Sequence, residues 1–115
     1  MKNIQLTCAH ALVKFLIKQK ILIDGKKEPL FPGVFGIFGH GNVACLGQAL
    51  QENQNDLPTW RGHHEQNMAL TGIAYSRAKR RKQIFIATSS VGPGSTNMIT
   101  AAAVAMSNRL PILFL

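Results

Sequence analysis

The sequence predicts an α/β fold in which helices cover both faces of a mostly parallel sheet, giving three layers. Three observations favour this fold. Short apolar runs without polar alternation, typical of strands buried on both faces, recur along the chain. Segments with helical spacing of apolar residues separate these runs, and Gly-rich turns follow two of them. Strands that alternate with helices in this way pair in parallel.

The first element that we expect is a helix over residues 6–20, with Thr7 as its N-cap. Its apolar positions recur at the i, i+3, i+4, i+7 and i+8 spacing of one helix face. They are Ala9, Leu12, Val13, Leu16 and Ile17. Residues 23–33 are polar and contain Gly and Pro, so they predict an irregular connection.

A strand and a second helix come next. The run "VFGIFG", residues 34–39, is short and apolar, as in a buried strand. In "VACLGQALQ", residues 43–51, helical spacing puts Val43, Leu46 and Leu50 on one side. The polar residues 52–59 predict a loop after this helix.

The second half of the chain repeats the alternation of helix and strand. We expect a helix from about His64 to Lys79 and a buried strand from Gln83 to Thr88. After a Gly-rich turn, Ser95 or Thr96 caps a fourth helix over residues 98–108. The apolar face expected for that helix consists of Met98, Ile99, Ala102 and Met106.

The final run, "LPILFL", predicts another buried strand, residues 110–115. A central strand without a following helix leaves its sheet face uncovered, so residues 1–115 are interpreted as a partial domain, a fragment of a longer protein.

Length and composition indicate one intracellular domain. The 115 residues are 46% apolar, enough for a modest core. No run approaches the roughly 20 apolar residues of a membrane span, and residues 1–5 do not start a signal-peptide core. Cys8 and Cys45 lack metal-ligand or C-x-x-C spacing, which predicts two buried thiols rather than a disulfide.

The chain is basic, with 13 Lys and Arg against 5 Asp and Glu and a formal charge of +8. Such a charge favours an anionic partner. However, five of these cations lie in "RAKRRK", residues 77–82, at the end of a predicted helix, where they complement the helix dipole. A solvated helix end is therefore the favoured interpretation, and a basic nucleic-acid-binding module is the alternative.

Two Gly-containing loops are candidates for ligand binding. "GHGN", residues 39–42, and "SSVGPGS", residues 89–95, each follow a predicted strand. Ligands of open parallel sheets bind beyond the carboxyl ends of the strands, and glycine lets the backbone approach them closely. Neither loop has the spacing of a P-loop or of a G-x-G-x-x-G motif. On this pattern alone, ordinary turns remain an alternative.

Glu65 is a candidate acid–base residue. The helix dipole would favour its anion near the helix start, whereas burial beside Met68 and Ala69 would raise its pKa. The alternative is a first-turn glutamate that bonds backbone N–H groups. His63 and His64 are expected to be polar surface residues or local hydrogen bonders, as histidines beside a helix start usually are. The chain has no H-x-x-x-H or Cys/His set that predicts a metal site.

Three segments together resemble a known family. They are "GIFGHGN", "GHHEQNMALTGIAYSRA" and the stretch from Ile84 to Leu115. These segments are similar to the N-terminal, pyrimidine-binding domain of enzymes that depend on thiamine diphosphate (thiamine pyrophosphate). The types concerned are acetolactate synthase and pyruvate decarboxylase. The H-E-x-x-[MA]-A element lies at residues 64–69, and the T-S-x-G-P-G-x-x-N element at 88–97 with one extra residue.

The loop "FGHGN" and the extra residue in "TSSVGPG" look most like the inositol-catabolic branch of that family. This branch opens a cyclic polyol dione by hydrolysing a carbon–carbon bond. An acetolactate synthase-like carboligase and a 2-oxo acid decarboxylase are the alternatives within the family.

The resemblance implies roles for individual residues. Glu65 corresponds to the glutamate that bonds a ring nitrogen of the cofactor's aminopyrimidine and favours its imino tautomer, which then deprotonates the thiazolium carbon. Gly92, Pro93 and Gly94 correspond to a tight turn beside the cofactor. His40 and Asn42 correspond to a loop that contacts substrate oxygens.

The resemblance also implies what this sequence lacks. In the family, a separate C-terminal domain with a G-D-G...N motif binds the diphosphate and Mg²⁺, and no such motif occurs here. The active site forms between subunits, so we expect a cytoplasmic homodimer or larger assembly and an inactive fragment. A free-standing subunit that docks on a diphosphate-binding partner is the remaining possibility.

Overall fold

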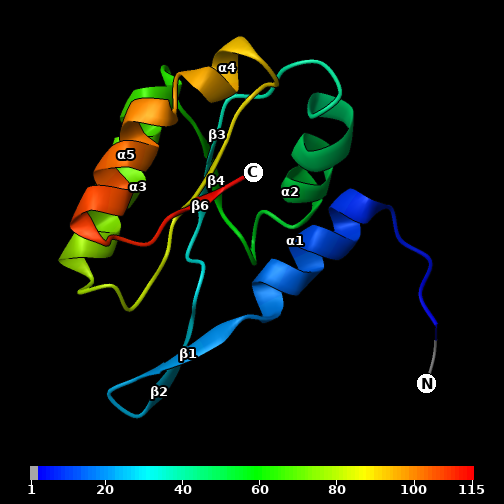
Figure 1. Ribbon diagram of the computed structural model, residues 1–115. Coiled ribbons are helices and arrows are strands. Elements are labelled where there is room, and N and C mark those ends of the chain that lie inside the picture. Colours follow the sequence, from blue (N-terminus) through cyan, green and yellow to red (C-terminus); the bar gives the residue numbers. More distant parts are fainter. Residues whose placement is uncertain (1–2) are drawn as a thin grey trace.

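The computed structural model describes residues 3–115 and confirms the predicted α/β class. Four parallel strands form one sheet in the order β4-β3-β5-β6. They are β3 (Val34–Gly36), β4 (Thr59–Arg61), β5 (Ile86–Thr88) and β6 (Leu113–Phe114). Helices α1 and α2 lie on one side of this sheet, and α3 and α5 lie on the other (Figure 1).

The first helix, α1 (Cys8–Lys18), begins where the sequence predicts. The hydroxyl of Thr7 accepts from the backbone N–H of His10 at 3.2 Å, so Thr7 is the N-cap. Two residues of this helix, Val13 and Leu16, are buried where it packs against α2. Cys8 and Cys45 are both exposed free thiols, so the expectation that they are buried is wrong. Each lies on the outer side of its helix.

The expected irregular connection over residues 23–33 is wrong, because most of it forms a hairpin. Strands β1 (Lys20–Ile23) and β2 (Lys26–Pro29) pair antiparallel around Asp24 and Gly25. Both turn residues have positive φ, 49° and 79°, as a two-residue hairpin turn requires. Strand β4 also lies partly in a segment expected to be a loop.

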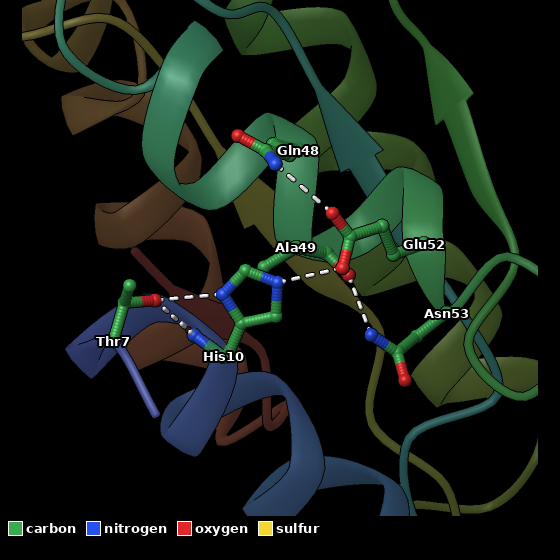
Figure 2. Close-up of polar contacts among 6 residues, drawn as sticks. All are labelled: Thr7, His10, Gln48, Ala49, Glu52 and Asn53. Atoms are coloured by element: carbon green, nitrogen blue, oxygen red, sulfur yellow. Dashed lines mark hydrogen bonds and ion pairs between the residues drawn. The ribbon is translucent and has the colours of Figure 1, made fainter. Parts of the chain in front are cut away.

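The second helix starts with a π-helical turn, η1 (Val43–Gly47), and continues as α2 (Gln48–Glu52). Leu46 and Leu50 are buried as predicted, whereas Val43 is 57% exposed. The side chain of His10 reaches across from α1 to Glu52 on α2 (Figure 2). This contact joins the exposed side of the two helices, whose buried faces pack together through the first core.

Helix α3 (Glu65–Ala78) matches the predicted helix within one residue at each end. It packs against β5 and against α5 (Ile99–Asn108), forming the second of two hydrophobic cores. The first core lies under α1 and α2. The buried residues shared by α3 and its neighbours are Met68, Ala69, Ile73, Ala87, Met98, Ala101 and Ala105.

The predicted bounds of the fourth helix, residues 98–108, match α5 within one residue, but its predicted cap and part of its predicted face are wrong. Ser95 and Thr96 lie inside a short helix, α4 (Pro93–Thr96), and do not cap α5. The buried face of α5 is Ala101 and Ala105, while Ile99 and Met106 are 64% and 82% exposed. Small side chains on that face let α5 approach α3 closely. The prediction from hydrophobicity alone had placed the larger residues Ile99 and Met106 on the buried face.

No helix within residues 3–115 is long and apolar enough to cross a membrane. Met1 and Lys2, part of the segment considered for a signal peptide, lie outside the described residues.

Candidate functional site

The two Gly-containing loops meet beyond the carboxyl ends of β3 and β5. The amide Nδ2 of Asn42 donates to the carbonyl oxygen of Ser89 at 3.1 Å, which ties one loop to the other. A Cβ added to Gly39 would lie only 2.4 Å from Cβ of Ser90. Position 39 therefore admits only glycine while the loops keep this contact.

The parallel register explains why these loops converge. Gly36, the last residue of β3, pairs with Arg61 of β4 and with Thr88 of β5. All three strands therefore end at the same level, and the segments that follow them leave the sheet together. The segment after β4 leads directly into Glu65.

Glu65 is the first residue of α3 and is half-buried. Its Oε2 accepts a hydrogen bond from Nδ2 of Asn97 at 3.0 Å. A Cβ added to Gly94 would lie 3.2 Å from Oε1 of Glu65 and 2.3 Å from Oγ of Ser90. The carboxylate therefore lies against the second Gly-containing loop rather than away from it.

The hydrogen bond from Asn97 and the backbone N–H of Glu65 itself lower the pKa of this carboxyl below 4.5. Partial burial acts in the opposite direction, and the nearby His64 contributes a smaller lowering. Of the two opposing effects expected from the sequence, burial is therefore the weaker, because the carboxylate keeps both hydrogen bonds and partial contact with water. Glu65 is an ionised acceptor at neutral pH.

The predicted turn residues Gly92, Pro93 and Gly94 lie at the start of α4. Gly92 has a φ of 69°, which favours glycine, and Pro93 occupies the first helical position. Gly94 is buried between Ser90 and Glu65. The turn thus presents bare backbone beside the carboxylate.

His40 and Asn42 differ in their surroundings. The side chain of His40 is exposed, and its carbonyl oxygen accepts from the N–H of Asn42 at 2.7 Å. Asn42 is half-buried and uses its amide N–H to join the loops. Within residues 3–115, no donor bonds its amide oxygen, which can therefore act as an acceptor. His63 and His64 are exposed, as expected.

Sequence reasoning assigned no role to Asn97 or Ser90, yet both contact this site. Asn97 lies 32 residues after Glu65, so no local spacing connects them. Ser90 lies under Gly39 and Gly94 in the loop with the extra residue. The only sequence signal was the membership of both residues in one motif.

A pocket of about 500 Å³ lies between α2, β3 and β4. It is lined by Ile37, Phe38, Val43, Gly47, Leu50, Gln51, Gln54, Thr59 and Arg61. Phe38 and Val43 flank the loop of residues 39–42, so this pocket opens beside the candidate site.

The basic run of residues 77–82 has partners within the chain. Nε of Arg81 donates to the carbonyl oxygen of Arg109 at 2.9 Å, which caps α5. Nζ of Lys82 lies 3.6 Å from Asp24, and that of Lys79 lies 5.6 Å from the ring centre of Tyr75. These contacts agree with a solvated helix end.

Comparison with known proteins gives one family match and several close relatives. Residues 8–115 match the family described as thiamine pyrophosphate enzyme, N-terminal TPP binding domain. A 3D-(3,5/4)-trihydroxycyclohexane-1,2-dione hydrolase of Listeria innocua is 53% identical over 99% of this chain. Its namesakes from Geobacillus thermodenitrificans and Bacillus thuringiensis are 53% and 51% identical over the whole chain. The chain spans 18% of the length of each relative.

Proposed function

The chain belongs to the thiamine pyrophosphate enzyme family as its N-terminal TPP-binding domain, and we propose that Glu65 binds the aminopyrimidine ring of that cofactor. The complete protein then hydrolyses a carbon–carbon bond of 3D-(3,5/4)-trihydroxycyclohexane-1,2-dione, giving 5-deoxyglucuronate in inositol catabolism. The observation that carries the proposal is the placement of the ionised Glu65 carboxylate against the Gly94 turn.

The residues at this site fit the pyrimidine end of the cofactor. A flat heteroaromatic ring needs a surface without side chains, which Gly92 and Gly94 supply, and an acceptor for a ring N–H, which Glu65 supplies. The described residues offer no comparable site for the diphosphate end of the cofactor and its metal ion. Residues 3–115 contain no group of three His, Cys, Asp or Glu side chains that could hold a metal ion.

When bound, the cofactor supplies a nucleophilic carbon that adds to a substrate carbonyl. The chain's own contribution is to hold a proton in place. The Glu65 carboxylate accepts a hydrogen bond from the ring nitrogen, and its negative charge favours the protonated state of that nitrogen. Asn42 keeps the two loops together, so the ring and the substrate-facing loop hold a fixed separation.

The substrate would contact the loop of residues 39–42. The exposed imidazole of His40 and the amide oxygen of Asn42 can bond hydroxyl groups of a polyol ring. The 53% identity over 99% of the chain, which includes this loop, supports the ring substrate named for the relatives. The alternative is the 2-oxo acid of a carboligase or decarboxylase.

The rest of the active site belongs to parts of the protein beyond these residues. The relatives are more than five times as long as this chain, which covers 18% of each. We propose that a separate domain holds the diphosphate and Mg²⁺, that this domain comes from a second subunit, and that the assembly works in the cytoplasm.

Activity of the complete protein tests the proposal. We expect Glu65→Gln to lower turnover of the cyclic dione by about 10²- to 10⁴-fold, the usual contribution of acid–base catalysis. Glu28→Gln is the matched control, because Glu28 lies on the hairpin strand β2, away from this site. Circular dichroism would verify that both variants remain folded. Near-normal turnover in Glu65→Gln would refute the assignment, and turnover of pyruvate instead of the dione would favour the alternative substrate.

A further inference from the structure

The carboxylate of Glu65 has two oxygens in different surroundings. Oε2 accepts from the side-chain amide of Asn97 at 3.0 Å, while Oε1 lies beside Gly94, 3.2 Å from the position that a Cβ at residue 94 would take. A glutamate side chain has three rotatable bonds, so one fixed oxygen restricts where the other can lie. Within residues 3–115, Asn97 is the side chain that donates a hydrogen bond to Glu65.

Asn97 is itself held in place. Its backbone N–H donates to the carbonyl oxygen of Pro93 at 3.3 Å, and it ends α4 just before the buried Met98. The same short helix has Gly92 as its N-cap and contains Gly94. The turn beside the carboxylate and the amide that holds the carboxylate are therefore joined through one short helix.

We infer that Asn97 is a positioning residue, which fixes Oε2 of Glu65 so that Oε1 meets the ring nitrogen of the cofactor. This inference rests on the function proposed above. The amide is suited to the task because its N–H₂ group can only donate, so it orients a carboxylate without competing for the ring proton. An aspartate at position 97 would instead put a second carboxylate at the same distance and repel Glu65.

Ligand discrimination in the complete protein tests the inference without any measurement of turnover. The probes are thiamine pyrophosphate and its 1′-deaza analogue, in which a CH group replaces the ring nitrogen. Isothermal titration calorimetry gives Kd for each. We expect the unmodified protein to prefer the natural cofactor by about tenfold or more, the contribution of one hydrogen bond to a charged group.

Asn97→Ala should reduce that preference to about threefold or less, because Oε1 is no longer directed at the ring. Its Kd for the deaza analogue should stay within about twofold of the unmodified protein, because that analogue makes no bond to Glu65. Asn97→Asp, which keeps the size of the side chain, should lose the preference as well. Asn67→Ala is the control, because Asn67 is exposed on the same helix as Glu65.

Two results would overturn the inference, and they differ from each other. If the unmodified protein binds both ligands equally, Glu65 does not contact the ring nitrogen, and the proposed function fails together with the inference. If the unmodified protein discriminates and both Asn97 variants discriminate equally well, the proposed function stands and the role of Asn97 is wrong.

Discussion

The Nε2 atom of His10 lies 2.8 Å from Oε2 of Glu52, so the first helix is bonded to the second (Figure 2). On its other side the imidazole bonds the hydroxyl of Thr7 at 2.7 Å. With Nε2–H donating to Glu52, the neutral ring accepts at Nδ1 from the Thr7 hydroxyl. Helix α2 continues η1, which starts right after Asn42, so this contact supports the helix that follows the loop of residues 39–42.

The stability that Glu52 contributes through this contact should depend on pH. Hydrogen bonds from Gln48 and then His10 lower the pKa of Glu52 below 4.5, and Lys14 adds a small lowering. A carboxyl with a lowered folded-state pKa contributes stability above its unfolded-state pKa and loses it as the pH falls through the folded-state value. We expect the melting temperature of Glu52→Gln to lie below that of the unmodified chain at about pH 6, with the difference vanishing towards about pH 3. A difference that grows on acidification would contradict this.

Glu65 should titrate below its ordinary range, with Asn97 as the main cause. We expect the ¹³C carboxyl resonance of Glu65, assigned by its disappearance in Glu65→Gln, to report a pKa below 4.5. In Asn97→Ala this pKa should rise, because the anion loses its strongest donor. The corresponding stability is present near neutral pH and lost as the pH falls through the folded-state pKa. An unchanged pKa in Asn97→Ala would show that the hydrogen bond does not form in solution.

Gly94 should tolerate no side chain while Ser90 is present. A Cβ at position 94 would lie 2.3 Å from Oγ of Ser90, so we expect Gly94→Ala to cost about 1–3 kcal/mol of unfolding free energy, typical of overpacking. Urea denaturation measures this cost. Adding Ser90→Gly removes the clash and should recover most of the loss, with Ser90→Gly alone as the matched control. If Gly94→Ala lowers the unfolding free energy equally with Ser90 and with Ser90→Gly, the clash with Ser90 is not the cause of the loss.

The sequence predicted elements whose signal is local. Helical spacing located α1 and α3 within two residues, and unbroken apolar runs located β3 and β5. It failed for the hairpin of β1 and β2, because the short polar strand β2 looks like a loop, although Asp24–Gly25 is a typical hairpin dipeptide. The face of α5 was wrong because close helix packing selected Ala101 and Ala105 over larger apolar residues.

The site was predictable as a set of motifs but not as a geometry. The order of the strands brings Glu65, Ser90 and Asn97 together, and that order follows from tertiary pairing rather than from spacing in the chain. For the same reason the sequence could not give the direction of the pKa shift of Glu65. Burial could be guessed from Met68 and Ala69, whereas the donor, Asn97, lies 32 residues away.

Leu57 should be a large contributor to stability, although it lies in a segment expected to be a plain loop. It is fully buried in the core under α1 and α2. We expect Leu57→Ala to lower the unfolding free energy by about 2–5 kcal/mol, the usual cost of a cavity. Leu22→Ala is the matched control with little effect, because Leu22 is 72% exposed on the hairpin. Chemical denaturation measures both, and similar values for the two variants would contradict the assigned core.

The basic run of residues 77–82 should give no strong binding to nucleic acid, despite the net charge of +8. Arg81 and Lys82 already bond groups within the chain, and the run is confined to one helix end instead of spreading along a face. A protein that neutralises several phosphates loses affinity steeply with salt, with a slope of about −0.9 per phosphate. We expect a slope weaker than about −2 for a duplex oligonucleotide, from fluorescence anisotropy across a salt series. The double variant Arg77→Gln, Arg80→Gln should leave that weak slope nearly unchanged. A steep slope that this variant reduces would instead identify the run as a phosphate-binding surface, and the nucleic-acid-binding alternative would then need to be reconsidered.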